Sequence, residues 1–290
     1  MVASLLYPAQ CFLGEGPFWH PHRGSLFWVD IEGKTFYEYH WADQQVTVRR
    51  LDYRVTLLVH GQDNQLILGL EGGIGRYDLV NETFTWLADL EKDRASHRCN
   101  DGKVDSRGRL WLGTMHMDFH TGAGSLYSVE QDLLPRKKQG GLTISNGMAW
   151  SADNSRLYFI DSPTGRVQSF FYDEAGGCIA FEKDVILIPP HLGAPDGMAI
   201  DQEGMLWIAH WGGFGVYRWN PNNGQLMESV SLPVPNVTSC VFGGESMDYL
   251  MITTARQGLS PEDLQKYPHS GDVFVQQVAV KGTLPNRCAF

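Results

Sequence analysis

The stretch APDGMAIDQEGMLWIAH, residues 194–210, contains a short alternating run, a polar turn and a second apolar run. This pattern is typical of two β-strands joined by a tight turn. The second run has five relatives along the chain, each following a polar or glycine-containing turn: GSLFWVD (24–30), NQLILGL (64–70), GRLWLGT (108–114), SRLYFID (155–161) and DYLMITT (248–254). Their leucines are 40 to 49 residues apart, so the sequence contains six copies of one unit.

Each unit is long enough for a four-stranded sheet. One such sheet cannot bury both of its faces, whereas six sheets arranged radially bury them against each other. The repeat therefore predicts an all-β fold, a six-bladed β-propeller with four-stranded antiparallel blades, formed as a single domain over residues 1–290. One helical turn is expected in SPEDLQKY (260–267), where Ser260 can cap a helix that Pro261 begins.

Composition excludes several classes of function. The net charge of −10 argues against nucleic acid, because phosphate binding needs a basic surface. The N-terminal segment has no basic residues, and Pro8 interrupts its apolar stretch. We therefore expect neither a signal peptide nor a membrane anchor, and we predict a cytoplasmic protein. The five cysteines are at least 48 residues apart and form no CxxC motif, which predicts reduced structural thiols. The sequence favours no particular oligomeric state, and a monomer is compatible with it.

Polar residues recur ten or eleven positions before each leucine of the repeat. In a propeller, equivalent positions of different blades lie on one ring around the axis. The ring positions are Glu15, Thr56, Asn100, Asn146, Asp196 and Ser239, with Asp101 competing for the place of Asn100. A polar turn would account for each residue separately. Carboxylates that meet on an axis would repel each other, however, and a divalent cation is the natural partner for them.

Glu15, Asn146 and Asp196 would offer such an ion two negative charges and one neutral oxygen. Oxygen donors suit Ca²⁺, Mg²⁺, Mn²⁺ or Fe(II), and Zn²⁺ stays open. Three protein ligands also leave coordination positions for water or a substrate carbonyl, which is the arrangement of a catalytic ion. The predicted cofactor is therefore one divalent metal ion.

Several strings resemble the gluconolactonase and regucalcin family: LGEGPFW, RCNDGKVDSRGRLWLGTM, SNGMAWSADNSRLYFID and PDGMAIDQEGMLWIAHWGG. The resemblance implies a six-bladed propeller with a divalent metal that hydrolyses aldonolactones to sugar acids. It implies metal ligands at Glu15, Asn146 and Asp196, and substrate contacts at Arg98 and Asn100. A further substrate residue falls on Asp118, where the animal members have Glu. The ending TTARQGLSPEDLQKYPHSGDVF looks more like that of bacterial pentonolactonases.

The mechanism expected from this reading is ester hydrolysis of a small-molecule sugar lactone. Asp196 is the predicted acid/base that moves the proton to the leaving ring oxygen. Arg98, Asn100 and Asp118 would hold the hydroxyls and the new carboxylate, with Asp101 positioning water. The motifs do not choose between pentonolactones and gluconolactone.

Other readings stay open. The chain could be a non-catalytic calcium-binding propeller that acts as a regulator or scaffold, or a metal-dependent hydrolase of another ester. His116 and His120 lack the HExxH context of a zinc protease, and no GxSxG nucleophile motif is present. His210 is expected to be a packed histidine, and Trp211 could face a sugar at the channel mouth.

Overall fold

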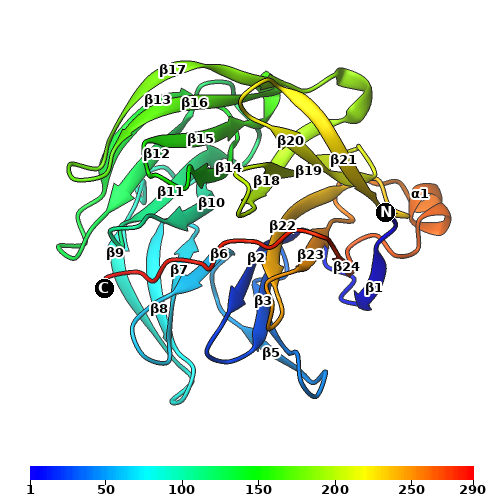
Figure 1. Cartoon of the computed structure of the whole chain (residues 1–290). Helices are drawn as coiled ribbons and strands as arrows, with labels where there is room; N and C mark the ends of the chain where they lie inside the picture. Colours follow the sequence, from blue (N-terminus) through cyan, green and yellow to red (C-terminus); the bar gives the residue numbers. More distant parts are fainter.

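Six four-stranded antiparallel sheets surround a central axis in the computed structural model, which describes residues 1–290 (Figure 1). This confirms the predicted six-bladed propeller. The strands nearest the axis are β2, β6, β10, β14, β18 and β22, each of which contacts the next around the ring. The outer strand of each blade lies at the rim.

The strands follow the chain blade by blade. Blade 1 comprises β2 (Gly14–His20), β3 (Ser25–Asp30), β4 (Thr35–His40) and β5 (Val46–Arg50). Blade 2 comprises β6 (Val55–His60), β7 (Gln65–Leu70), β8 (Gly73–Asp78) and β9 (Thr83–Asp89). Blade 3 comprises β10 (His97–Val104), β11 (Leu110–His116), β12 (Gly124–Val129) and β13 (Arg136–Leu142).

The second half repeats the arrangement. Blade 4 comprises β14 (Ser145–Trp150), β15 (Arg156–Asp161), β16 (Arg166–Asp173) and β17 (Cys178–Leu187). Blade 5 comprises β18 (Ala194–Ile200), β19 (Leu206–Trp211), β20 (Gly215–Asn220) and β21 (Gln225–Ser231). Short 3₁₀ turns, η1 (Ser162–Thr164) and η2 (Pro190–Leu192), connect elements of blades 4 and 5.

The sixth blade combines the first strand of the chain with the last three. Its strands are β22 (Val237–Gly243), β23 (Tyr249–Thr254), β24 (Val273–Gln277) and, as the outer strand, β1 (Ser4–Tyr7) from the N-terminus. Ser4 lies opposite Val275 in this pairing, and Leu5 lies opposite Phe274. No pattern in the sequence indicates a strand at residues 4–7, so the closure of the ring by this segment is apparent only from the structure.

The core lies between the blades. The six leucines that define the repeat have no exposed surface, as expected for residues packed between neighbouring sheets: Leu26, Leu66, Leu110, Leu157, Leu206 and Leu250. The predicted helical turn is also confirmed as α1 (Pro261–Lys266), which Ser260 caps by accepting a hydrogen bond from the backbone N–H of Asp263. No helix in the structure is both long and apolar enough to span a membrane.

Blades 3 and 5 each contain a buried aspartate at the equivalent position, and its carboxylate links a turn to the strand that follows. In blade 5, Oδ1 of Asp201 accepts hydrogen bonds from two backbone N–H groups of its turn. Oδ2 accepts from the indole of Trp207 at 2.9 Å and from Nε of Arg218 at 2.8 Å. Asp105 holds Trp111 and Arg109 in the same way in blade 3. In these two blades the carboxylate therefore fixes the tryptophan of the second strand.

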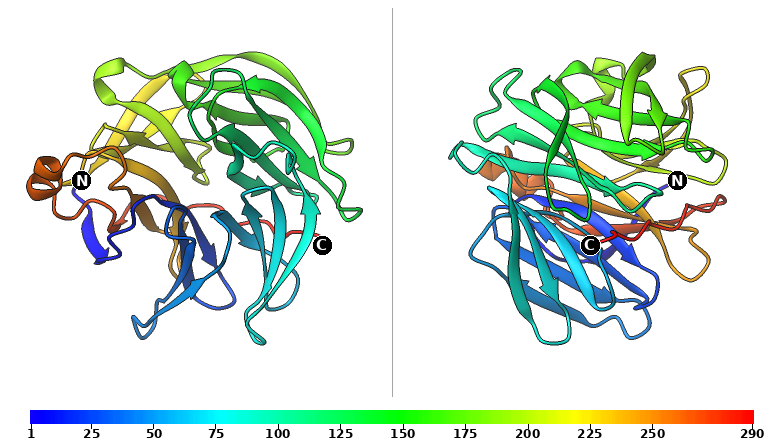
Figure 2. Two further views of the ribbon diagram at one scale, coloured as in Figure 1. Left: turned by 180° about the vertical axis from the view of Figure 1, so that it is seen from behind. Right: turned by 90° about the vertical axis from the view of Figure 1, so that its left-hand side faces the viewer.

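The C-terminal segment crosses one end of the channel, seen as the red trace through the centre of Figure 1. Figure 2, which views the molecule from behind and from the side, shows this segment lying along one face of the ring. Backbone hydrogen bonds attach it to blade 2, from Cys288 to His60, and to blade 3, from Ala289 to Gly108. One end of the axial channel is therefore covered by the chain itself.

Replacing Asp201 with alanine should destabilise the protein by about 1–3 kcal/mol, because it leaves Nε of Arg218 and the Trp207 N–H without their acceptor, whereas Glu203 and Glu228 still pair with the Arg218 guanidinium. Equilibrium urea unfolding measures this change. Asp93, an exposed residue, provides the control, and Asp93→Ala should stay within about 0.5 kcal/mol of the parent. Equal stability of both variants would contradict the proposed role of the Asp201 cluster.

Candidate functional site

A β-bulge interrupts the inner strand of every blade near its ring position. In β2 the register shifts between Glu15 and Phe18, in β14 between Ser145 and Met148, and in β18 between Pro195 and Met198. The other three inner strands have the same irregularity. Bulges re-aim side chains and are frequent beside functional sites. Here they bring polar side chains of different blades toward the axis.

Glycines after the ring positions allow the inner strands to approach each other. A Cβ on Gly147 would lie 2.7 Å from the backbone oxygen of Asp196, and one on Gly197 would lie 2.1 Å from Oγ of Ser239. Neither distance is compatible with a side chain at these positions. The Asn-Gly and Asp-Gly pairs in the sequence therefore serve close packing around the axis.

Four of the six ring positions line one cavity of about 280 Å³, namely Glu15, Asn100, Asn146 and Asp196. Arg98 lines it as well. Thr56 instead donates a hydrogen bond to Gly69 within its own blade, and Ser239 lines a second cavity. The structure thus brings together the three predicted metal ligands and two of the predicted substrate contacts.

Two buried oxygens in this cavity have no hydrogen-bond partner. They are Oδ1 of Asn146 and Oδ1 of Asp196. The Asn146 amide is oriented by its Nδ2, which donates to Oγ of Ser162 at 3.0 Å, so the carbonyl oxygen is the unpaired end. Glu15 Oε2 accepts a single bond from the Gly16 backbone N–H at 3.0 Å. Because unpaired buried oxygens are costly, the donor set fits an oxygen-coordinated divalent cation.

The two carboxyl groups of the cavity have strongly raised pKa values. Burial raises the pKa of Asp196 well above its usual range, and the charge of Glu15 raises it further. The pKa of Glu15 is also raised, first by burial and then by the charge of Asp101. A bound divalent ion would favour the ionised form of both groups.

Arg98 and Asn100 act together on the same strand. Nη1 of Arg98 donates to Oδ1 of Asn100 at 2.5 Å and to the backbone oxygen of Cys99 at 2.9 Å. Nδ2 of Asn100 donates to the backbone oxygen of Ser145 at 2.8 Å, on the neighbouring blade. The Asn100 side chain therefore positions the guanidinium, whose Nε and Nη2 make no hydrogen bond within the protein.

Two other predicted site residues lie outside this cavity. Asp101 lines the second cavity, toward the end of the channel that the C-terminal segment covers, and its Oδ1 accepts from the Gly102 N–H at 2.7 Å. Asn100, and not Asp101, therefore shares the cavity with Glu15. Asp118 is in the loop after β11, with 79% of its side chain exposed, and does not line the cavity.

Apolar and amide side chains complete the cavity wall. Trp211 lines it, at the place where a sugar-facing tryptophan was expected. Met115, Phe119 and Gln257 line it too, although no motif in the sequence indicated them. His210 is fully buried, with Nδ1 2.9 Å from the backbone oxygen of Leu192, and burial lowers its pKa to about 4. It is a packed histidine, as expected.

Residues 13–256 match the family described as SMP-30/Gluconolactonase/LRE-like region. The chain belongs to this family. Regucalcin from Oryctolagus cuniculus is 35% identical over 284 residues, 96% of this chain and 95% of the relative. The protein of Bacillus subtilis named "Putative sugar lactone lactonase YvrE" is 33% identical over 288 residues, 98% of each chain.

A solved structure agrees with this assignment to the SMP-30/gluconolactonase family. The crystal structure of a calcium-binding protein, regucalcin, from Agrobacterium tumefaciens strain C58 superposes with a TM-score of 0.95. That chain is 28% identical, and the match covers 100% of this chain and 98% of the other. The propeller is therefore shared over its whole length.

The raised pKa of Glu15 predicts an unusual pH dependence for the metal-free protein. As the pH rises above 4.5, the ordinary pKa of a glutamate, the unfolded chain loses the Glu15 proton while the folded protein retains it. The free energy of unfolding should then decrease with rising pH. Thermal unfolding of the chelator-treated protein and of Glu15→Gln measures this, and the decrease should be smaller in the variant.

Exposed Glu245 provides the matched control. In Glu245→Gln the free energy of unfolding should decrease with rising pH as steeply as in the parent. Saturating Ca²⁺ should raise the melting temperature of the parent most at the higher pH values, because the ion competes with protons for the ligands. If the free energy of unfolding of Glu15→Gln decreased with pH as steeply as that of the parent, the raised pKa of Glu15 would be contradicted.

Proposed function

We propose that the chain is a divalent-metal-dependent hydrolase that opens a sugar aldonolactone to the aldonic acid. The observation that carries this proposal is the pair of unpartnered buried oxygens of Asn146 and Asp196, in a cavity that also exposes the Arg98 guanidinium. The name of the Bacillus subtilis relative, a sugar lactone lactonase, supports the same class of substrate.

The cavity suits a compact, polar ligand. Its volume of about 280 Å³ lies just below the roughly 300–1,000 Å³ typical of small-molecule sites. Its lining combines the apolar side chains of Trp211, Met115 and Phe119 with charged and amide side chains. A sugar lactone presents both an apolar ring face and hydroxyl groups to such a wall.

Glu15, Asn146 and Asp196 would hold the ion, which when bound would polarise the lactone carbonyl and acidify a water molecule. Asp196 also supplies the carboxylate that takes the proton of the attacking water and returns it to the ring oxygen as the C–O bond breaks. Arg98 faces the position where negative charge develops, and Asn100 keeps the guanidinium in place.

An Asp196→Asn variant tests this assignment. At saturating metal, kcat for lactone hydrolysis should fall about 10²–10⁴-fold, the usual contribution of a general acid/base. Acid release from stereoisomeric pentono- and hexonolactones provides the assay, with metal-stripped protein reconstituted separately with Ca²⁺, Mg²⁺, Mn²⁺, Fe(II) or Zn²⁺. Exposed Asp93 again offers a control, and Asp93→Asn should hydrolyse the lactones at the parental rate.

Near-normal turnover by Asp196→Asn would refute the proposed role of Asp196. If the reconstituted parent binds a metal but hydrolyses no lactone faster than the spontaneous reaction, the lactonase proposal is wrong. That outcome would favour a calcium-binding protein without catalytic activity, in keeping with the description of the Agrobacterium relative as calcium-binding.

A further inference from the structure

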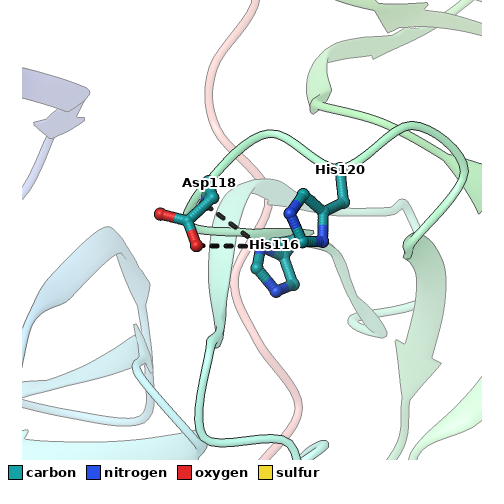
Figure 3. A group of neighbouring side chains, drawn as sticks. All are labelled: His116, Asp118 and His120. Carbon is teal, nitrogen blue, oxygen red and sulfur yellow. Dashed lines mark hydrogen bonds and ion pairs between the residues drawn. The ribbon is translucent and has the colours of Figure 1, made fainter.

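Three side chains with metal-ligating atoms gather in the loop that follows β11. The ligand atoms of His116, Asp118 and His120 all lie within 4.8 Å of one another. Figure 3 shows the imidazole of His120 over that of His116, with the Asp118 carboxylate directed toward His116. The two rings stack with centroids 3.8 Å apart, and Oδ2 of Asp118 is 3.9 Å from Nδ1 of His116.

A fourth histidine stands beside this cluster. His97 pairs with His116 across β10 and β11, so their side chains project from the same face of the sheet, and their ring centroids are 5.0 Å apart. Only 7% of His97 is exposed, yet neither of its ring nitrogens has a hydrogen-bond partner. Because a buried imidazole without any partner is costly, this residue independently indicates a ligand at the cluster.

We propose that His116, Asp118 and His120 form a second metal site, with His97 as the fourth donor, and that this site takes a transition-metal ion such as Zn²⁺. Imidazole donors favour Zn²⁺, Cu²⁺ or Ni²⁺ over Ca²⁺ and Mg²⁺, whereas the site of Glu15, Asn146 and Asp196 offers oxygen alone. The second site therefore disfavours Ca²⁺ and Mg²⁺, which the oxygen site can bind.

Binding of zinc requires the stacked rings of His116 and His120 to separate, so that a nitrogen of each can face the same ion. In a tetrahedral zinc site, neighbouring ligand atoms are about 3.3 Å apart, given bonds of about 2.0–2.1 Å. Asp118 and His120 are both exposed, so their side chains can rotate toward His116 without disturbing the core. Nδ1 of His116 accepts the Asp118 backbone N–H at 3.1 Å, so Nε2 is the nitrogen of this ring that stays available to a metal.

The position of the loop gives the second site a functional consequence. Phe119 lies between two of the ligands and lines the cavity of the candidate active site together with Met115. A metal that ties Asp118 and His120 to His116 would hold the Phe119 ring over the substrate. This consequence rests on the proposed lactonase function, whereas the binding of zinc does not.

Calorimetric titration of ZnCl₂ into the full chain tests the site, with saturating CaCl₂ present to fill the oxygen site. One zinc per chain should bind to the parent. His120→Ala and Asp118→Asn should each weaken this binding by at least about 100-fold, since even loss of a supporting residue costs about 10–100-fold. Exposed His191 is the matched control, and His191→Ala should bind zinc like the parent. Glu15→Gln should keep the zinc site, because its ligands are separate.

Cu²⁺ added in place of zinc gives a second readout. Its electron paramagnetic resonance spectrum should show nitrogen hyperfine splitting from imidazole ligands, which the oxygen site cannot produce. Equal zinc affinity in the parent and in His120→Ala, or a copper spectrum with oxygen donors only, would overturn the proposal. Because these measurements use no lactone, they stand even where the lactonase assay fails.

Kinetics test the role of Phe119 if the lactonase proposal holds. Zinc should lower KM for the lactone in the parent without changing kcat, and it should have no effect on KM in His120→Ala. An unchanged KM in the zinc-loaded parent would overturn the link between this loop and the substrate cavity.

Discussion

The pairing of β1 with β24 is the constraint on which the rest of the structure depends. The ligands of the candidate site come from blades 1, 4 and 5, and they meet only if the ring is closed. Closure acts directly on the site, since Oγ1 of Thr238 in blade 6 donates to the backbone oxygen of Gly14, next to Glu15. The backbone N–H of Cys11 likewise donates to Gly271. The segment that leads from β1 into β2 is thus fixed to blade 6, which keeps Glu15 in the same cavity as Asp196.

The bulges then sort neighbouring residues toward opposite ends of the channel. Asn100 lines the candidate active site, whereas the next residue, Asp101, lines the second cavity together with Lys103. Burial raises the pKa of Asp101, and the charge of Lys103 partly offsets this effect. The alternation of a strand, locally broken by the bulge, therefore places Asp101 and Lys103 in a different cavity from the predicted metal ligands.

The sequence allowed the architecture and the centre of the site to be predicted for a physical reason. Each blade has nearly the same length from its ring position to its buried leucine, so one step of ten or eleven residues located Glu15, Asn146 and Asp196. The same step could not choose between Asn100 and Asp101, because the bulge changes which neighbour faces the axis.

Features that depend on contacts between distant segments could not be predicted in this way. The strand at residues 4–7 has no strong pattern of its own, and its partner lies at the other end of the chain. The pairing of His97 with His116 depends on the register of β10 and β11, which the sequence does not display. His116, Asp118 and His120 were visible as alternate residues, but the sequence could not show that their loop folds back on itself. In each case the tertiary contact, and not local propensity, decides the position.

Charge balance connects the fold to the proposed chemistry. Within the candidate site, the carboxyls of Glu15 and Asp196 face a single cation, Arg98, whose own pKa is lowered by burial. With both carboxyls ionised the cavity is negative, which repels the oxyanion of an ester hydrolysis. A divalent ion reverses the sign, so the same cavity then attracts negative charge as it develops. The arrangement is therefore unfavourable for the reaction without the ion and favourable with it. This follows from buried charges that the closed ring keeps away from water.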